Sequence, residues 1–251
     1  MARLTALNFE KHKTLRVAPN HAISYAIGRH LLQLRVGEVS KAIVNFPVFI
    51  TRQDNGEFTL SAMTSFEVGR NLFIQSQNWD AVFRPALMQS YPFYLMQPED
   101  GTKNPVLAIH EESQVFGDQG EALFNEAGKL TLWVNQIRAA LMEDANNLVQ
   151  SFMFIKKITE LNLIRSIDIA VHYETGTIDR IRSLNTINED MLHSMSSDQI
   201  AELRDSGYLA PIYAILFSIY QLNALIRRHN KNQDKLISRI SLEVSKDPSL
   251  F

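Results

Sequence analysis

The chain has 251 residues, 45% of them hydrophobic and 21% charged, which is enough apolar surface to build a sizeable core. Its formal net charge of -2 provides no overall positive field, so we do not expect nucleic acid as a partner. The absence of cysteine excludes disulfides, thiol nucleophiles and thiolate metal sites. We therefore expect a soluble globular protein that forms a single domain over residues 1–251.

The amino-terminal segment does not have the apolar core of a secretory signal. Charged side chains interrupt its apolar stretches, among them Glu10, Lys11 and Lys13. Together with the lack of cysteine, this predicts a cytoplasmic protein, while export to the surface without a cleaved signal stays open. The longest uncharged stretch, residues 208–226, has an apolar part too short for a bilayer. We therefore expect a buried helix there and no integral membrane span.

The first part of the chain is rich in short predicted strands. Strands are expected at residues 31–36, 46–50 and 58–63, with a short helix at 38–45. An Asp-Asn-Gly turn at 54–56 favours antiparallel pairing of the second and third strands. This part of the sequence therefore predicts a hairpin.

The next segment combines apolar runs with many aromatic residues. A further buried strand is predicted at 71–74. Proline-punctuated aromatic residues follow: Trp79, Phe83, Tyr91, Phe93 and Tyr94. We expect them to form core, with Trp79 mostly buried, and the alternative is a ligand-facing aromatic pocket. After a loop at 97–104, a short strand is expected at 106–109.

The second half predicts a long helix and a second hairpin. Apolar residues recur at intervals of three and four over residues 130–164, as is typical of one face of a helix. These residues are Val134, Ile137, Leu141, Leu148, Phe152, Ile155 and Ile158. The hairpin has an alternating strand at 167–173, a turn at Gly176 and a second strand at 178–184.

Helices are expected after this hairpin. Asn188 can cap a helix at 189–193, and a capping-box pattern at 196–199 starts another that ends at Gly207. Pro211 then opens a long apolar helix. Its apolar residues, which need cover on several sides, are Ile212, Ile215, Leu216, Ile219, Leu222 and Ile226. The fold class that we predict is α+β, with mostly antiparallel sheets from hairpins packed against long carboxy-terminal helices.

The sequence contains few motifs that indicate a chemical reaction. There is no GxGxxG, P-loop, HExxH or GxSxG motif, so no catalytic residue, cofactor or metal is predicted. The acidic loop at 110–112 could supply at most a fragment of a metal site. Basic residues near the carboxyl end, at 227–235, favour a solvated helix end over an anion site. His21 and Glu38 could do acid/base work or hold a ligand; alternatively, His21 caps a turn and Glu38 opens a helix.

Several short pieces, taken together and in order, resemble one known family. They are His21-Ala22, Glu38 followed by the Phe-Pro-Val-Phe run at 46–49, Asn71-Leu72-Phe73-Ile74 followed by Trp79, the Tyr-Pro-Phe-Tyr run at 91–94, the glycine-rich stretch 117–128, and the pattern Leu203, Gly207, Leu209, Ile212, Tyr213, Leu216 and Ser218. This arrangement resembles the SapC family, which is linked to bacterial surface layers and has no agreed catalytic residues. Gln89 and Ser90 stand where a basic residue is expected, and Asn78 where a glycine is expected, which argues against anion binding there.

The resemblance implies an accessory or binding protein that associates with surface-layer or cell-envelope components, with no assignable reaction. A protein partner at the envelope is therefore expected, and a homo-oligomer stays open. The alternative function is an enzyme or small-molecule-binding protein. Its pocket would be built around His21, Glu38, Asn71, Trp79 and Tyr91.

Overall fold

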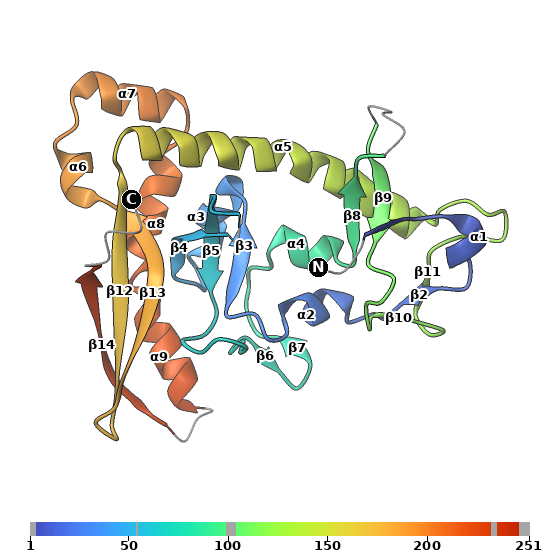
Figure 1. Ribbon diagram of the computed structural model, residues 1–251, viewed down its shortest axis with the longest axis horizontal. Coiled ribbons are helices and arrows are strands. Elements are labelled where there is room, and N and C mark those ends of the chain that lie inside the picture. Colours follow the sequence, from blue (N-terminus) through green and yellow to red (C-terminus); the bar gives the residue numbers. More distant parts are fainter. Residues whose placement is uncertain (1–3, 54, 99–103, 232–234, 246–251) are drawn as a thin grey trace. The chain divides into compact units, whose positions relative to one another are not determined.

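The computed structural model describes residues 4–53, 55–98, 104–231 and 235–245 (Figure 1). Contacts between residues divide the chain into two compact units. Unit 1 comprises Met1–Ile27, Ile74–Trp79 and Ala86–Asn146, and unit 2 comprises Gly28–Phe73, Asp80–Pro85 and Asn147–Phe251. That residues 1–251 form a single domain stays a prediction.

Unit 1 is built from short strands and helices. Its elements are β1 (Thr5–Ala6), α1 (Phe9–His12), β2 (Arg16–Val17), α2 (His21–Ala26), β6 (Ile74–Gln75), β7 (Asn78–Trp79), α4 (Ala86–Ser90), β8 (Phe93–Met96), β9 (Val106–Ile109), β10 (Phe116–Gly117), β11 (Glu121–Ala122) and the first part of α5 (Leu132–Glu160). The strands form two antiparallel sheets of order β1-β9-β8 and β10-β2-β11, and β6 pairs with β7. The strand predicted at 106–109 is confirmed as β9.

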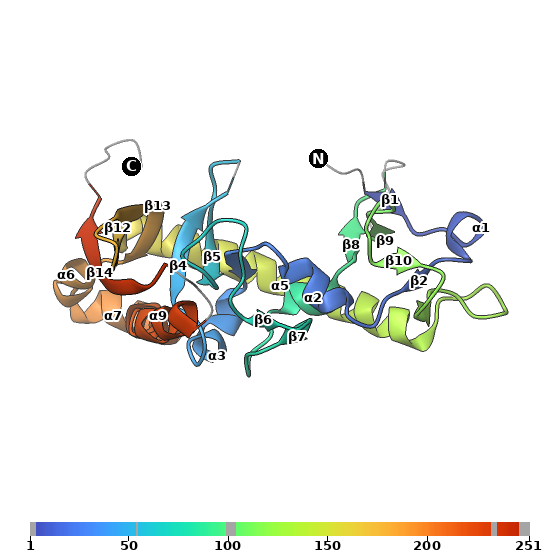
Figure 2. The ribbon, with the colours of Figure 1, turned by 90° about the horizontal axis from the view of Figure 1, so that it is seen from below.

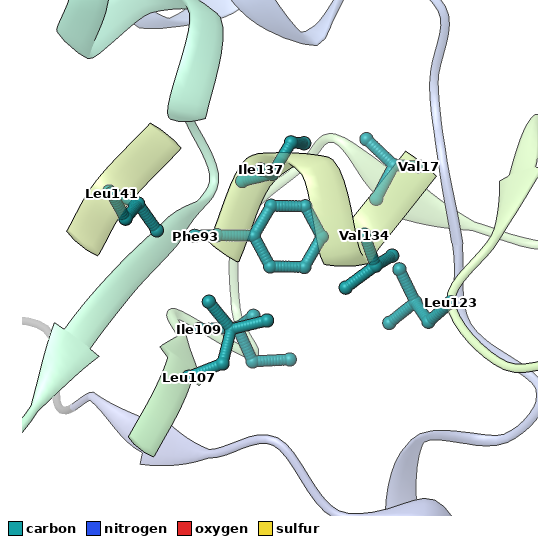
Figure 3. Packing of buried hydrophobic residues seen from close by; sticks show 8 residues of the cluster. All are labelled: Val17, Phe93, Leu107, Ile109, Leu123, Val134, Ile137 and Leu141. Atoms are coloured by element: carbon teal, nitrogen blue, oxygen red, sulfur yellow. The ribbon is translucent and has the colours of Figure 1, made fainter. Parts of the chain in front are cut away.

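The core of unit 1 surrounds the ring of Phe93 (Figure 3). The buried cluster consists of Val17, Phe93, Leu107, Ile109, Leu123, Val134, Ile137 and Leu141. Three of these residues, Val134, Ile137 and Leu141, lie at intervals of three and four on α5, so this part of the predicted apolar face is confirmed. The aromatic segment thus contributes its most buried ring to the core, as expected.

Unit 2 is organised around one six-stranded sheet. Its elements are β3 (Leu31–Leu34), the 3-10 helix η1 (Val36–Glu38), α3 (Val39–Ala42), β4 (Val48–Arg52), β5 (Phe58–Met63), the second part of α5, β12 (Ile164–Tyr173), β13 (Ile178–Ile187), α6 (Glu189–His193), α7 (Ser197–Asp205), α8 (Leu209–Ser218), α9 (Gln221–Lys231) and β14 (Ile237–Val244). The strand order is β14-β12-β13-β4-β5-β3, and every neighbouring pair is antiparallel.

The predicted fold class and both predicted hairpins are confirmed. β4 pairs with β5, and β12 pairs with β13. Gly56 and Gly176, in the two turns, have φ of 84° and 82°, which glycine adopts without steric cost. Asp54 and part of the loop predicted at 97–104 lie outside the described residues.

The predicted helix caps in unit 2 are also confirmed. The side chain of Asn188 accepts a hydrogen bond from the backbone N–H of Met191 at the start of α6. At the start of α7, Ser196 and Gln199 form the reciprocal capping box. These helices begin where the sequence predicts because a cap depends on residues within one turn.

The strand predicted at 71–74 is wrong. The Asn71 side chain accepts a hydrogen bond from the N–H of Phe73 and bends the chain into a turn, and β6 begins only at Ile74. The Leu72 N–H donates to the carbonyl of Thr64. Leu72 and Phe73 are nevertheless buried, because the turn presses both side chains into unit 2.

The single long helix predicted from Pro211 is also wrong, because α8 and α9 are separate helices. Backbone hydrogen bonds from residues 220, 222 and 223 reach back three residues instead of four, which tightens the chain between the helices. Ile212, Ile215 and Leu222 are buried as expected. α8 contacts α3, α7, β4 and β13, and α9 contacts β14 (Figures 1 and 2).

None of the described helices is by itself long and apolar enough to cross a membrane, although α8 and α9 together pass that test with a bend of 41° between them.

Replacing Gly120 by Ala should destabilise unit 1. Gly120 has φ of 108°, and an added Cβ would overlap the carbonyl oxygen of Val17. We expect a loss of roughly 2–4 kcal/mol in the free energy of unfolding, measured by urea denaturation. Gly117→Ala is the matched control, because nothing lies near its added Cβ and its φ is not positive. Equal midpoints for the two variants would contradict the close approach at Gly120.

Replacing Ile215 by Ala should destabilise unit 2. Ile215 is fully buried on α8, so the loss should be about 2–5 kcal/mol through lost apolar burial and the cavity left behind. Phe217, two residues away and 59% exposed, supplies the control. Phe217→Ala should change stability by only about 0.5 kcal/mol. If Ile215→Ala melted like wild type, α8 would not be part of the core.

Candidate functional site

His21 and Tyr91, two of the five predicted pocket residues, lie in aromatic contacts of unit 1. His21 opens α2, where its Nδ1 lies 3.1 Å from the carbonyl oxygen of Ala18. Its ring meets that of Trp133 edge-on, with centroids 5.6 Å apart. The ring of Tyr91 contacts Tyr25 on the same helix at 5.6 Å. His21 therefore caps a turn, which is the structural role that the sequence left open.

The polar end of Tyr91 and the indole of Trp79 have separate surroundings. The Tyr91 hydroxyl lies 2.6 Å from the Ser113 hydroxyl. Trp79 lies on β7 opposite Ile74 and is mostly buried, as predicted, although it is not among the fully buried core residues. His21, Tyr91 and Trp79 thus belong to one unit, but α2, β7 and the residue after α4 carry them on three different elements.

The other two predicted residues belong to unit 2. The Glu38 carboxylate accepts a 2.8 Å hydrogen bond from the backbone N–H of Arg35, which stabilises the start of η1. Asn71 organises the turn before β6. Both side chains therefore have local structural roles. Because the five residues are divided between two units, a single pocket built from all of them stays a prediction.

Unit 1 contains a cavity beside the Tyr-Pro-Phe-Tyr run. Its volume is about 280 Å³, and α4 and the first part of α5 line it. The polar lining consists of Gln89, Ser90, Gln136 and Asp144. Trp133 lies at its wall and also contacts Phe93 at 5.6 Å. Sequence reasoning missed Trp133, although its position at the start of the long helix could have indicated it.

The acidic loop at 110–112 binds a histidine of the same unit. His12 is almost completely buried, and its Nδ1 accepts the backbone N–H of Asn8 at 2.9 Å. The ring proton therefore lies on Nε2, which donates to Glu111 at 2.8 Å. This hydrogen bond lowers the pKa of Glu111 below its ordinary value, although burial acts in the opposite direction. Among the described residues, no three His, Asp or Glu side chains come together as a metal site.

The basic residues near the carboxyl end are largely used inside unit 2. The Arg228 guanidinium lies 4.2 Å from the Phe73 ring centroid and 2.5 Å from the Asp80 carboxylate. His229 is fully buried, and its Nε2 lies 3.0 Å from the carbonyl of Lys235. Lys235 in turn pairs with Asp179 at 3.0 Å. These contacts favour a structural role over an anion site.

The second part of α5 exposes an apolar face, which we call the α5 face. Its side chains and exposed fractions are Leu148 49%, Val149 55%, Phe152 59% and Met153 51%. Their spacing of one, four and five residues places them on one side of the helix. Leu148 and Phe152 belong to the apolar pattern that predicts the helix, and the structure exposes both side chains.

The residues on the buried side of this part of α5 explain why the α5 face is exposed. Phe154, Ile155 and Ile158 point into unit 2, and Ser151 is buried beside them. The Ser151 hydroxyl accepts the backbone N–H of Val36 at 2.8 Å and donates to the Asn147 carbonyl at 2.7 Å. A polar residue thus occupies the core side because it satisfies a backbone group, while apolar residues remain outside.

Comparison with known proteins gives one match. The SapC family model matches residues 7–225, which include parts of both units. No curated protein and no solved structure matches the chain.

Glu111→Gln should alter stability in a pH-dependent way. Because the pKa of Glu111 is lowered in the folded protein, its charge stabilises the fold above the ordinary value of 4.5. That contribution is lost as the pH falls through the folded pKa. The variant should melt below wild type at neutral pH, and the gap should close below pH 4.5. Thermal melts with Glu112→Gln as the control measure this, and a gap that is constant with pH would argue against the interaction.

Proposed function

This chain belongs to the SapC family, and on that ground we propose that it is an accessory binding protein of bacterial surface-layer or cell-envelope components. We further propose that a protein partner docks on the α5 face. No reaction is part of this proposal. The observation that carries it is the exposure of four large apolar side chains on one side of one helix.

Exposed apolar residues are common singly, but a contiguous set is characteristic of interaction surfaces. Leu148 and Val149 lie one turn before Phe152 and Met153, so the four side chains adjoin one another along α5. Phe and Met are among the residues enriched in interfaces. Covering this face would bury surface that is otherwise in contact with water, which favours association.

The charges beside the α5 face are compatible with a docking role. Lys156 follows it by one turn and pairs with Glu160 at 3.9 Å, and Lys157 pairs with Glu202. Both lysines therefore lie next to carboxylates, and the face itself carries no charge at residues 148, 149, 152 and 153. Charged side chains thus lie on the carboxyl-terminal side of the α5 face, as at the polar rim of a protein interface.

Introducing charge into the α5 face should abolish partner binding without unfolding the protein. The test compares wild type with the double variant Val149→Lys, Phe152→Lys in co-sedimentation with isolated cell envelopes. Lysine keeps good helix propensity, so the melting temperature should hardly change. Binding should fall at least about tenfold, because buried aromatic residues dominate interfaces.

The matched control places the same two charges on other exposed apolar residues of unit 2. Val68 and Val82 are 84% and 91% exposed and lie outside α5, so Val68→Lys, Val82→Lys should bind envelopes like wild type. Failure of wild type to sediment with envelopes, or equal loss in both double variants, would overturn the proposal. Sedimentation velocity of the pure protein tests whether a second copy of the chain, and not an envelope protein, covers the α5 face. A dimer that only the α5 variant converts to monomer would show that a second copy covers it.

A further inference from the structure

Unit 2 contains a cavity of about 560 Å³, about twice the volume of the one in unit 1. Residues from β4, β5, β12 and β13 line it together with the carboxyl end of α5 and the start of α6. The volume lies within the range of small-molecule sites, roughly 300–1,000 Å³. None of the five residues predicted as a pocket from the sequence is among its described lining residues.

The floor of this cavity is polar and buried. Ser166 on β12 and Asn185 on β13 are cross-strand partners, only 3% and 2% exposed. The Ser166 hydroxyl lies 2.6 Å from the Asn185 side-chain oxygen, and the Asn185 amide donates to the Ile50 carbonyl at 3.1 Å. These bonds leave the second amide N–H of Asn185 and the lone pairs of the Ser166 oxygen for a ligand. The floor thus offers one donor and one acceptor.

The rim adds neutral polar groups of both kinds. Among the described residues, no hydrogen bond uses the side-chain amide of Asn162, which has φ of 53° and lies two residues after the end of α5. Asn188 uses its oxygen to cap α6, so its NH₂ group remains as a donor. The Thr159 hydroxyl donates to the Ile155 carbonyl and keeps its acceptor lone pairs. The rim therefore offers both donors and acceptors.

Part of the cavity lining is apolar. Phe58 is half-buried on β5, and the Arg52 guanidinium lies 4.8 Å from its ring centroid. Ile164 and Met191 extend the apolar lining. Arg52 is the one cation among the described lining residues, and none of them is acidic. A cationic ligand is disfavoured, and one guanidinium stacked on a ring is not the cluster of basic residues that binds phosphates.

We propose that this cavity binds an uncharged, hydroxyl-rich small molecule of the saccharide class. A sugar hydroxyl both donates and accepts, so it matches a site that offers amide N–H groups together with hydroxyl and amide oxygens. The apolar side chains of Phe58, Ile164 and Met191 supply contacts for the C–H groups of a sugar ring. The described lining residues include no carboxylate or histidine that could act as a general acid or base, and the proposal is one of binding only. This site is separate from the α5 face.

The test is calorimetric titration of the intact protein with methyl α-glucoside, methyl β-galactoside and N-acetylglucosamine. Glucosamine serves as the cationic comparator and hexanol as the apolar one. We expect saturable one-to-one binding of at least one neutral sugar, with weaker binding of both comparators. Asn162→Gly and Ser166→Ala should each weaken that binding about 5- to 10-fold, the loss typical of one hydrogen bond. Glycine accepts the positive φ at residue 162, so the first variant keeps its backbone.

Gln77→Gly is the matched control, because Gln77 is an exposed amide with φ of 62° in unit 1. It should bind the sugar like wild type. The proposal is overturned if none of the three neutral sugars binds, if hexanol or glucosamine binds more tightly than they do, or if Asn162→Gly and Gln77→Gly bind equally. Thermal melts of each variant show whether a loss of binding reflects unfolding. If Ser166→Ala does not fold, the comparison of Asn162→Gly with Gln77→Gly tests the proposed site by itself.

Discussion

The junction between β13 and β4 joins the two halves of the six-stranded sheet in unit 2. Two residue pairs form it, Leu184 with Thr51 and Asn185 with Ile50. The Asn185 side chain adds bonds to the Ile50 carbonyl and to Ser166, so one amide connects three strands. Leaving such a buried group unpaired costs about 1–3 kcal/mol, so the bonds between these polar side chains stabilise the centre of the sheet. The same two side chains form the floor of the larger cavity.

On the second part of α5, a polar residue is likewise buried while the apolar residue next to it is exposed. Ser151 occupies the buried side because the N–H of Val36 needs an acceptor there, and Phe152 next to it is exposed. The two surfaces that we connect with function therefore differ in chemistry. The α5 face is apolar and suits a protein partner, whereas the larger cavity of unit 2 combines neutral polar groups with apolar side chains and suits a small hydroxylated ligand.

Much of the fold could be predicted because the signals are local. A cap such as Asn188 and a turn such as that at Gly176 depend on residues within one helical turn or one hairpin. Prediction failed where side chains compete with the backbone. Asn71 bonds to the N–H of Phe73 and replaces a strand by a turn, and the apolar run after Pro211 divides into two helices. The edge strand β14 was not predicted, because its alternation becomes meaningful only beside β12.

The sequence by itself determined the α+β class, the antiparallel hairpins, the helix caps and membership of the SapC family. Tertiary structure alone decided which apolar residues are core. A period of three to four marks a helix face, but only the neighbouring elements decide that Ile155 is covered and Phe152 is not. The tertiary structure also places Ser166 against Asn185, 19 residues away along the chain. It assigns His21 and Glu38 to different units. A site is a property of distances in space, and spacing along a chain does not report distance once the chain has folded.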